Sequence, residues 1–326
     1  MAALPFEVPR GLPSGYTLPS QYRLRLRQRT ATATIKSAAV AIRDLAVAMF
    51  AATAAWRVVY TSISVPLKLA LLAVLILIVV RCQRGLENLT HEGSHYNFSR
   101  NHRLNDWLTD LLAALPTFQR VFGFRQTHVP KHHLFFGTAG DPDFNRYAAF
   151  DAKNIDRSSL WLYALSVMTR VPRYVGGWWW GVGTNPRTLV LGLAWHVVVY
   201  ITPVALILGP RGAMGAWFFF WLCPFALLLP PVRLIAEAEE HVYEDAKTIF
   251  EATVSNVGLL HRLFIHPNGD AYHLAHHLWP SVPHHQLQGM HEDLTALDPV
   301  YAASRVRTSL FQEPNAPGLE GRSVDA

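Results

Sequence analysis

Residues 62–82 read SISVPLKLALLAVLILIVVRC, an apolar run of the length that crosses a bilayer as a helix. Arg81 lies at its end, where long basic side chains reach the membrane interface. The preceding stretch, residues 38–60, is also apolar, but Arg43 and Asp44 interrupt it and leave a usable part that is short for a span. Together the two stretches predict a helical hairpin in the membrane.

A second apolar pair, residues 187–208 and 213–232, is joined by the tight Gly-Pro-Arg-Gly link at 209–212. Four spans place both termini on the same side of the membrane. Arg84 and Arg233 flank the spans on that side, which the positive-inside rule identifies as cytosolic. The expected fold class is therefore all-α integral membrane, with four transmembrane helices in two hairpins capped by a cytosolic helical layer.

The chain is expected to divide into three segments. Residues 1–37 form a basic cytosolic segment, residues 38–312 the membrane domain, and residues 313–326 a disordered tail rich in Pro, Gly and charge. The basic segment holds four alternating arginines, Arg23, Arg25, Arg27 and Arg29. Nucleic acid could bind such a run, but the adjacent spans favour a juxtamembrane role, and no nucleic-acid partner is expected. The aromatic run Trp178-Trp179-Trp180 is typical of a membrane interface.

The bulk composition supports a membrane protein whose metal chemistry uses nitrogen and oxygen ligands. Hydrophobic residues make up 51% of the chain and charged residues only 16%, against roughly 25% charged in an average soluble domain. The two cysteines, Cys82 and Cys223, exclude a disulfide framework and a four-thiolate zinc site. The alanine- and arginine-rich composition is typical of a GC-rich bacterial genome, so the expected location is the bacterial cytoplasmic membrane.

Nine histidines outside the spans form three boxes and one isolated site. The boxes are His91-Glu92-Gly93-Ser94-His95, His128-Val129-Pro130-Lys131-His132-His133 and His273-Leu274-Ala275-His276-His277, and the isolated residue is His241. Helical residues four apart lie on one face, ~6 Å apart, so each box can direct two or three imidazoles at one point. Nine ligands are too many for one metal. Two metals with four or five ligands each fit the number and leave a position open for oxygen.

The ordered set HxxxH, HxxxHH and HxxHH resembles the membrane fatty acid desaturase and hydroxylase superfamily. Asp141-Pro142-Asp143 follows the second box as in that family, and the third box continues in the similar run Leu278-Trp279-Pro280-Ser281-Val282-Pro283. Asn268 and Tyr272 precede the third box, and Glu240-His241 follows the last span, again in the family's manner. The resemblance extends from about residue 60 to 295.

The resemblance implies a dinuclear non-haem iron centre in a cytosolic cap, with dioxygen as co-substrate. The iron ligands that it implies are His91, His95, His128, His132, His133, His241, His273, His276 and His277. Some members have an asparagine that reaches iron through water, and this chain has Glu237 at that position. Several further groups are expected to orient ligand histidines or to contact iron through water: Glu237, Glu240, Asp141, Asp143 and Asn268.

An unactivated C–H bond requires an oxidant that amino-acid side chains cannot supply and that iron and oxygen provide. The resemblance therefore implies an oxygen-dependent oxidoreductase that desaturates a fatty acyl or lipid-like chain. The alternative is a hydroxylase or ketolase acting on a lipid, a carotenoid or a specialised metabolite. Because the chain has no cysteine-rich cluster and no GxGxxG loop, electrons are expected from a separate ferredoxin, rubredoxin or cytochrome-type donor. The basic cytosolic face suits an acidic carrier.

The first box is also the HExxH signature of a zinc protease, with Glu92 as general base and a carboxylate ligand available at Asp270. Such an enzyme needs only three protein ligands and leaves the other boxes unexplained. A metal transporter is a weaker alternative, because its ligands would lie within the spans, where only His196 is found. His196 is interpreted as a substrate contact or as a packed neutral side chain. The remaining histidines are expected to be solvated or to support ligands: His102, His261, His266, His284, His285 and His291.

Overall fold

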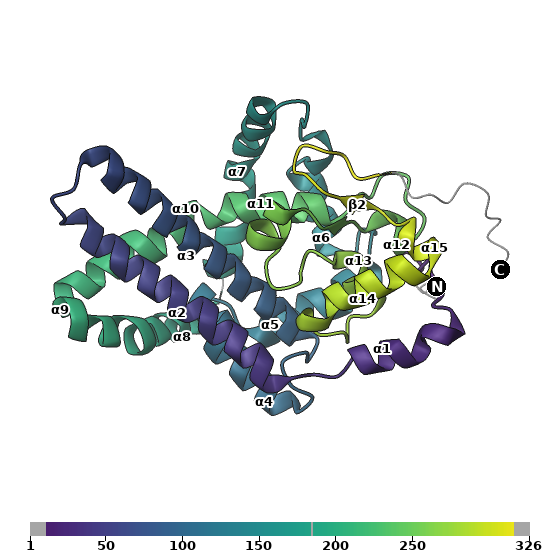
Figure 1. The fold of residues 1–326 in the computed structure, drawn as a ribbon, viewed down its shortest axis with the longest axis horizontal. Helices are drawn as coiled ribbons and strands as arrows, with labels where there is room; N and C mark the ends of the chain where they lie inside the picture. Colours follow the sequence, from purple (N-terminus) through teal and green to yellow (C-terminus); the bar gives the residue numbers. More distant parts are fainter. Residues whose placement is uncertain (1–10, 184, 316–326) are drawn as a thin grey trace, which may run out of the picture.

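The computed structural model describes residues 11–183 and 185–315. Long helices lie side by side at one end of the molecule, and shorter helices and loops form the other end (Figure 1). The expected helical architecture is confirmed, with one addition, a parallel pair of two-residue strands, β1 (Ser255–Asn256) and β2 (Val306–Arg307). The predicted tail lies outside the described residues from position 316 onward, and so do the side chains of Trp178–Trp180.

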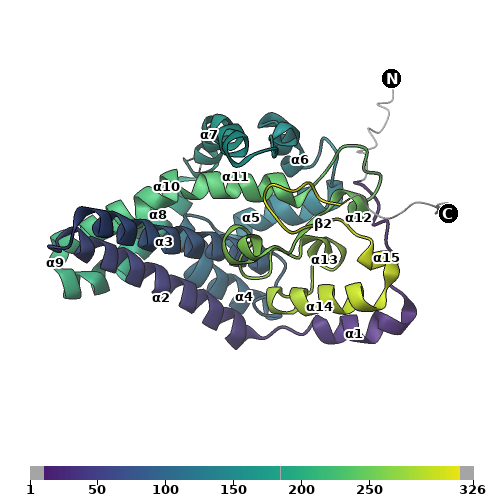
Figure 2. The same cartoon turned by 45° about the horizontal axis from the view of Figure 1, so that its top comes forward.

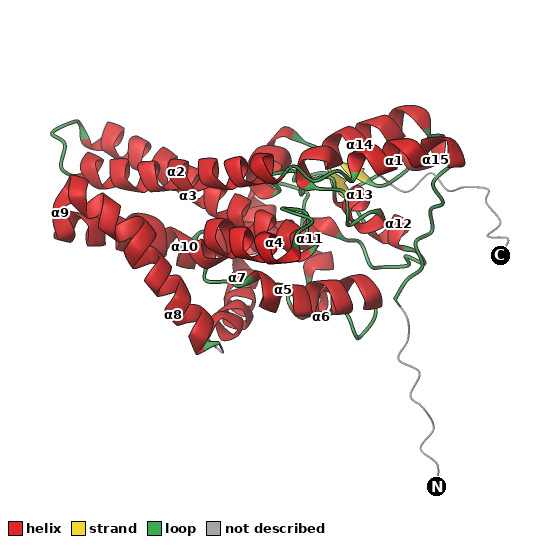
Figure 3. Ribbon diagram, turned by 90° about the horizontal axis from the view of Figure 1, so that it is seen from below, coloured by secondary structure: helices red, strands yellow, loops and turns green. Residues whose placement is uncertain are grey.

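The first hairpin consists of α2 (Thr34–Val59) and α3 (Val65–Ser94), which lie side by side along most of their length (Figures 1 and 3). Three fully buried alanines, Ala41, Ala48 and Ala55, recur every seven residues on α2. Small side chains at this spacing let two helix backbones approach closely in a membrane. Helix α3 continues past the apolar run, so its last turns carry the first histidine box into the other end of the molecule.

Helix α2 is longer than the sequence indicated, because it continues through Arg43 and Asp44 instead of ending at them. The Asp44 side chain is only 1% exposed and forms ion pairs of 2.8 Å with Arg43 and with Arg81 of α3. Partners within hydrogen-bonding distance offset much of the cost of burying a carboxylate. The prediction of a short first span is therefore corrected to a continuous helix that begins at Thr34.

In the described part of the chain, three helical runs are long and apolar enough to cross a membrane, namely α2, α3 and Pro186–Glu240. The third run contains α8 (Pro186–Trp195), η6 (His196–Ile201), α9 (Thr202–Trp217), η7 (Phe218–Leu222), α10 (Cys223–Leu227) and α11 (Leu229–Glu240). It turns back at Gly209, whose φ of 71° and ψ of 165° are non-helical. Glycine adopts this φ without a Cβ clash, and the turn lies in the predicted link, so that α8 and α10 both lead to α9 (Figures 1 and 3).

The remaining elements, most of them short, carry the second and third histidine boxes or lie around the boxes, and α7 lies along α11 (Figure 2). On the N-terminal side of the third run they are η1 (Ser20–Tyr22), α1 (Arg23–Arg29), α4 (His102–Thr109), η2 (Asp110–Ala114), η3 (Leu115–Thr117), α5 (Val121–Thr127), η4 (His128–His133), α6 (Pro142–Ala149), η5 (Ala152–Asn154) and α7 (Leu160–Gly183). After that run follow α12 (Ile249–Ala252), η8 (His261–Ile265), α13 (His273–Leu278), α14 (His284–Leu297) and α15 (Pro299–Ala302).

The basic N-terminal segment is helical and packs on the protein. Arg25 and Arg29 lie one turn apart on α1, and both form ion pairs with Asp293 of α14, at 3.3 and 2.9 Å. Arg29 also donates to Gln286 Oε1 at 2.8 Å. Figures 1 and 2 both show α1 beside α14. Two of the four alternating arginines thus bind an acidic residue of the same chain.

Gly93, inside the first box, lies where α3 touches α4. A Cβ at this position would be 2.3 Å from Thr109 Oγ1, and overpacking of this kind typically costs about 1–3 kcal/mol. We therefore expect Gly93→Ala to lower the thermal unfolding midpoint of the protein in detergent. Gly176→Ala on α7 is the matched control, since nothing lies within 4 Å of a Cβ there. Equal midpoints for the two variants would show that the contact with Thr109 is not tight in solution.

Candidate metal centre

The eight box histidines and His241 come together from four parts of the chain. The end of α3 carries His91 and His95, η4 the second box, and α13 the third. His241 follows the last residue of α11, where backbone hydrogen bonds from Val242 to Ala252 and from Val254 to Glu240 fix its position. Helices that are distant in sequence therefore direct all the predicted ligands into one region of the structure.

These histidines form two groups whose ligand nitrogens lie within 4.8 Å of one another. The five-histidine group consists of His91, His95, His128, His133 and His276. The four-histidine group consists of His132, His241, His273 and His277. Their membership coincides with the nine sequence-predicted residues, and their sizes match the expected four or five ligands per metal.

Within each group the imidazoles face each other through their Nε2 atoms. In the five-histidine group, His128 Nε2 lies 2.8 Å from His91 Nε2 and 3.0 Å from His133 Nε2. In the four-histidine group, His273 Nε2 lies 3.1 Å from His277 Nε2 and 3.3 Å from His241 Nε2. Two nitrogens each ~2.0–2.1 Å from a common metal ion are roughly 3 Å apart when they subtend a right angle. The spacing therefore fits imidazoles that share an ion.

Two ring nitrogens strengthen this interpretation. The Nε2 atoms of His95 and His276 are buried and have no hydrogen-bond partner within the described structure. A buried polar atom without a partner is costly unless something else satisfies it. Both nitrogens belong to the five-histidine group, so a metal ion bound there would satisfy them.

The second box departs from the α-helical pairing that its spacing indicated. His128 shares the five-histidine group with His133, five residues away, whereas His132 belongs to the four-histidine group and also lies within 4.8 Å of His128, together with Asp143. The cause is local, because residues His128–His133 form the π-helical segment η4, whose wider turn aligns side chains about five residues apart. The third box divides as well, since His276 joins the five-histidine group while His273 and His277 join the four-histidine group.

Burial keeps most of these imidazoles neutral, which is the form that binds metal ions. Loss of solvation, reinforced by neighbouring histidines, holds the pKa well below its usual value for His128, His133, His241, His276 and His277. His132 differs: burial opposes protonation, but the carboxylates of Asp143 and Asp141 outweigh it and raise the pKa of His132. A carboxylate that accepts from one ring nitrogen makes the other a better donor to a metal.

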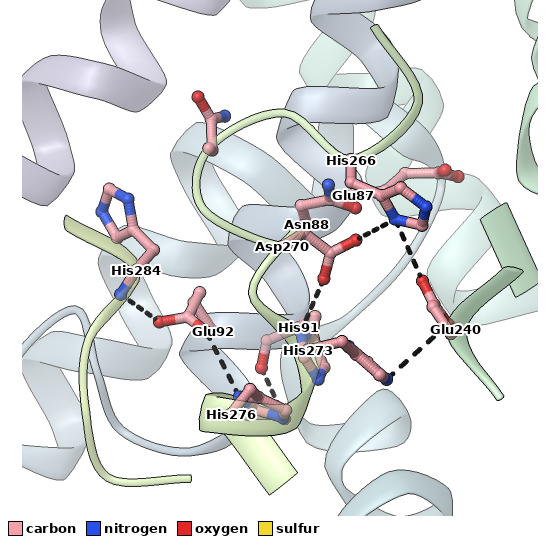
Figure 4. Close-up of polar contacts among 12 residues, drawn as sticks. Glu87, Asn88, His91, Glu92, Glu240, His266, Asp270, His273, His276 and His284 are labelled. Atoms are coloured by element: carbon pink, nitrogen blue, oxygen red, sulfur yellow. Dashed lines mark hydrogen bonds and ion pairs between the residues drawn. The ribbon is translucent and has the colours of Figure 1, made fainter. Parts of the chain in front are cut away.

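Carboxylates lie near the Nδ1 atoms of three ligands, and the one that accepts a hydrogen bond, at His132, favours Nε2 as the metal-facing nitrogen. Asp141 Oδ1 is 2.9 Å from His132 Nδ1, and Asp143 Oδ2 is 3.3 Å from the same atom. Asp270 Oδ1 lies 3.7 Å from His91 Nδ1. Glu92 Oε1 lies 3.8 Å from His276 Nδ1, and these last two contacts are drawn in Figure 4. Asp141 and Asp143 thus lie where the sequence led us to expect them.

The other three predicted supporting groups differ in position. Glu240 lies 3.8 Å from His273 Nε2 (Figure 4). Glu237 accepts from the Tyr174 hydroxyl at 2.8 Å and pairs with Arg146 at 3.3 Å, and it lines the same small cavity as four box histidines. Asn268 instead donates to Asp44 and to the Gly85 carbonyl, at the α2–α3 contact. A supporting role of Asn268 at the metal ligands stays a prediction.

Asp270, which the sequence offered only as a zinc ligand in the protease alternative, and His266, expected to be solvated or to support a ligand, both lie beside the centre. Asp270 accepts from His266 Nδ1 at 3.3 Å and from Arg84 Nη2 at 3.1 Å, and Glu240 lies 3.5 Å from His266 Nδ1 (Figure 4). Burial opposes ionisation of Asp270, but His266 and Arg84 outweigh it and lower its pKa. The available signal was an acidic residue three positions before the third box.

The remaining histidines lie outside both groups within the described residues. His284 faces Ser37, His291 faces Tyr301, and His102 stacks on Tyr96. His196 is fully buried among aromatic rings, Trp217 and Trp221 of the second apolar pair and Phe118 after η3. Its prediction as a substrate contact stays a prediction.

The protease interpretation of the first box finds little support in this geometry. Glu92 is buried, and its Oε2 accepts from the His284 amide at 2.7 Å and from Asn97 Nδ2 at 3.2 Å. A general base needs a carboxylate within reach of a reacting water. His91 and His95 moreover share their group with three further histidines, which exceeds the three protein ligands of a catalytic zinc.

Comparison with known proteins supports the family resemblance that the histidine boxes indicated. The fatty acid desaturase family profile matches residues 64–309, which is most of the chain and includes all three boxes and His241. The chain is also 24% identical over 243 residues to the dihydrorhizobitoxine desaturase of Bradyrhizobium elkanii, covering 70% of this chain and 68% of that protein. The match over more than half of the chain shows that the protein belongs to the fatty acid desaturase family.

Proposed function

We propose that this protein is a membrane diiron oxidoreductase that uses dioxygen to desaturate its substrate. The observation that carries the proposal is the division of nine histidines into groups of five and four, with Nε2 atoms facing each other at 2.8–3.3 Å. Two irons held by these groups would supply the oxidising power that an unactivated C–H bond requires. Desaturation removes two hydrogens from adjacent carbons. With two electrons and two protons added, dioxygen leaves as two waters.

The chain's own residues perform the supporting tasks. Asp141 accepts from His132 Nδ1 at 2.9 Å and holds that imidazole in the tautomer that presents Nε2 to a metal, while Asp270 and Glu92 lie near the Nδ1 atoms of His91 and His276, at 3.7 and 3.8 Å. Burial of the boxes excludes bulk water from the reacting centre. The electrons come from a separate ferredoxin, rubredoxin or cytochrome-type protein, as the sequence led us to expect.

We further propose four passes through the membrane, with the histidine boxes and both termini in the cytosol. The turn at Gly209 supports this topology, because it divides the run Pro186–Glu240 into two limbs. With α2 and α3 these limbs make four. A bacterial cytoplasmic membrane is the proposed location.

Desaturation is preferred to hydroxylation on the basis of the relative, whose name describes a desaturase that acts on dihydrorhizobitoxine. Only the reaction type is carried over to this chain. The fatty acyl or lipid-like substrate expected from the sequence stays a prediction. Hydroxylation or ketone formation by the same centre would instead leave the substrate with an added oxygen atom.

Metal analysis of the purified protein tests the proposal. We expect about two irons per chain and little zinc, because one six-coordinate iron cannot use nine histidines and still leave a position open for oxygen. Expression in iron-supplemented cells, with the metal measured by elemental analysis, is sufficient. A single zinc without iron would refute the diiron centre and revive the HExxH protease interpretation. Products that gain oxygen instead of losing hydrogen would replace desaturase by hydroxylase.

A further inference from the structure

The metal centre borders a cavity whose wall is charged. This cavity has a volume of about 460 Å³ and is lined by His128 of the five-histidine group, by Asp143, and by three arginines, Arg120, Arg146 and Arg233. A smaller cavity of about 90 Å³ lies next to it and shares His128, Asp143, Arg146 and Arg233 with it. Because further box histidines line the smaller cavity, the larger one is an approach to the metal centre.

The charges on the wall of the larger cavity favour an anion. Three guanidinium groups and the carboxylate of Asp143 line it, and Glu237 pairs with two of these arginines, Arg146 at 3.3 Å and Arg233 at 3.9 Å. The Arg146 side chain is half exposed and pairs with Asp143 at 2.6 Å, and the Arg120 side chain is one-third exposed and uses its Nε on Asp110. The planar guanidinium fork pairs with carboxylates in a bidentate manner. Asp143 would repel a doubly charged phosphate more strongly than a singly charged carboxylate.

The same wall is less favourable for a bare hydrocarbon chain than a wholly apolar wall, because polar and charged groups interrupt it. Each buried CH₂ group contributes about 0.8 kcal/mol only when it leaves water for apolar surroundings. Such surroundings exist elsewhere, in a cavity of about 420 Å³ lined by residues such as Leu189, Phe218 and Leu222 and by no polar atom. Phe118 lines both cavities, so the apolar cavity meets the charged one at this ring. No box histidine lines the apolar cavity.

We propose that the substrate is a small molecule bearing a carboxylate, which Arg120 and Arg146 bind in the charged cavity, close to the carbon atoms that are oxidised. The substrate class rests on the proposed function, because oxidation requires the metal centre. Binding of the carboxylate by the arginines does not depend on the proposed function. Since the cavity extends from the arginines to His128, the carboxylate and the oxidised bond belong to the same compact molecule rather than to opposite ends of a long acyl chain.

Fluorine NMR with 6,6,6-trifluorohexanoate and the matching neutral amide tests this proposal on the full-length, iron-loaded protein in detergent. We expect saturable binding of the carboxylate and at least about tenfold weaker binding of the amide, the factor that a charge-assisted hydrogen bond contributes. Arg120→Gln and Arg146→Gln are each expected to weaken binding of the carboxylate by about tenfold. Arg103→Gln, at an exposed position of α4, should leave the affinity for the carboxylate unchanged. Iron should broaden the fluorine signal more than zinc does in the metal-exchanged protein.

Equal affinity for carboxylate and amide, or an unchanged affinity in Arg120→Gln, would overturn the proposal. A retained unfolding midpoint and iron content will show that each variant is folded. Arg146 pairs with Asp143, which lies beside a metal ligand, whereas Arg120 pairs with Asp110, so Arg120→Gln tests carboxylate binding without disturbing Asp143. Oxidation of phosphatidylcholine acyl chains in vesicles, with no product from small carboxylates, would also overturn it. In that outcome the two irons would still be present, so the diiron proposal would stand.

Discussion

Replacing His132 with alanine is expected to abolish product formation and to empty the four-histidine group of metal. Three histidines would remain in that group, His241, His273 and His277, and Asp141 would lose the imidazole that it orients. Outer partners of metal ligands typically change metal affinity by about 10–100-fold. Loss of a ligand itself should exceed this range. Iron is therefore expected to fall from about two to about one per chain, together with loss of activity.

His276→Ala offers an informative comparison, because four histidines would remain in its group, His91, His95, His128 and His133. We expect activity to be lost again, but iron to be retained more fully than in His132→Ala. His285→Ala on α14 is the control, since His285 belongs to neither group among the described residues. Full activity in His132→Ala, or equal iron loss in His132→Ala and His285→Ala, would contradict the ligand assignment.

The sequence predicted the helical elements and the nine histidines that the fold brings together, because both are encoded locally. Apolar runs of about 20 residues need helices to satisfy their backbone in a membrane, and α3 and the turn at Gly209 lie where these runs placed them. Asp44 shows the limit of such reasoning. A charged residue inside an apolar run indicates the end of a span. Its ion pair with Arg81 on α3, which lets the helix continue, is seen only in the folded structure.

The allocation of ligands to two groups could not be predicted, because it depends on backbone geometry that spacing alone does not reveal. An α-helix pairs His128 with His132, whereas the π-helical turn of η4 pairs His128 with His133. The position of Asp270 beside His91 and the charged cavity could not be predicted for a related reason. Asp270, Arg120 and Arg146 belong to no motif and acquire their meaning only when the fold brings them to the centre.

Asp141→Asn is expected to weaken iron binding by about 10–100-fold, although the substitution changes a single atom. The carboxylate of Asp141 is fully buried and accepts three N–H groups: Oδ1 accepts from His132 Nδ1 at 2.9 Å and from the Asp143 amide at 2.8 Å, and Oδ2 accepts from the Gly137 amide at 3.0 Å. An asparagine side chain has one acceptor and one donor end. In either orientation its NH₂ would therefore face an N–H group and leave at least one donor unsatisfied.

Titration of the metal-free variant with ferrous iron, under argon, measures this effect directly. Excess iron should restore much of the activity of Asp141→Asn, because all nine histidines remain, whereas it should not restore His132→Ala. Asp143→Asn is expected to have a smaller effect, since its carboxylate lies further from His132 Nδ1, at 3.3 Å, and is 29% exposed. Asp293→Asn, which alters only the α1–α14 contact, should bind iron as the unmodified protein does. An unchanged affinity in Asp141→Asn would mean that the backbone of η4, rather than this carboxylate, orients His132.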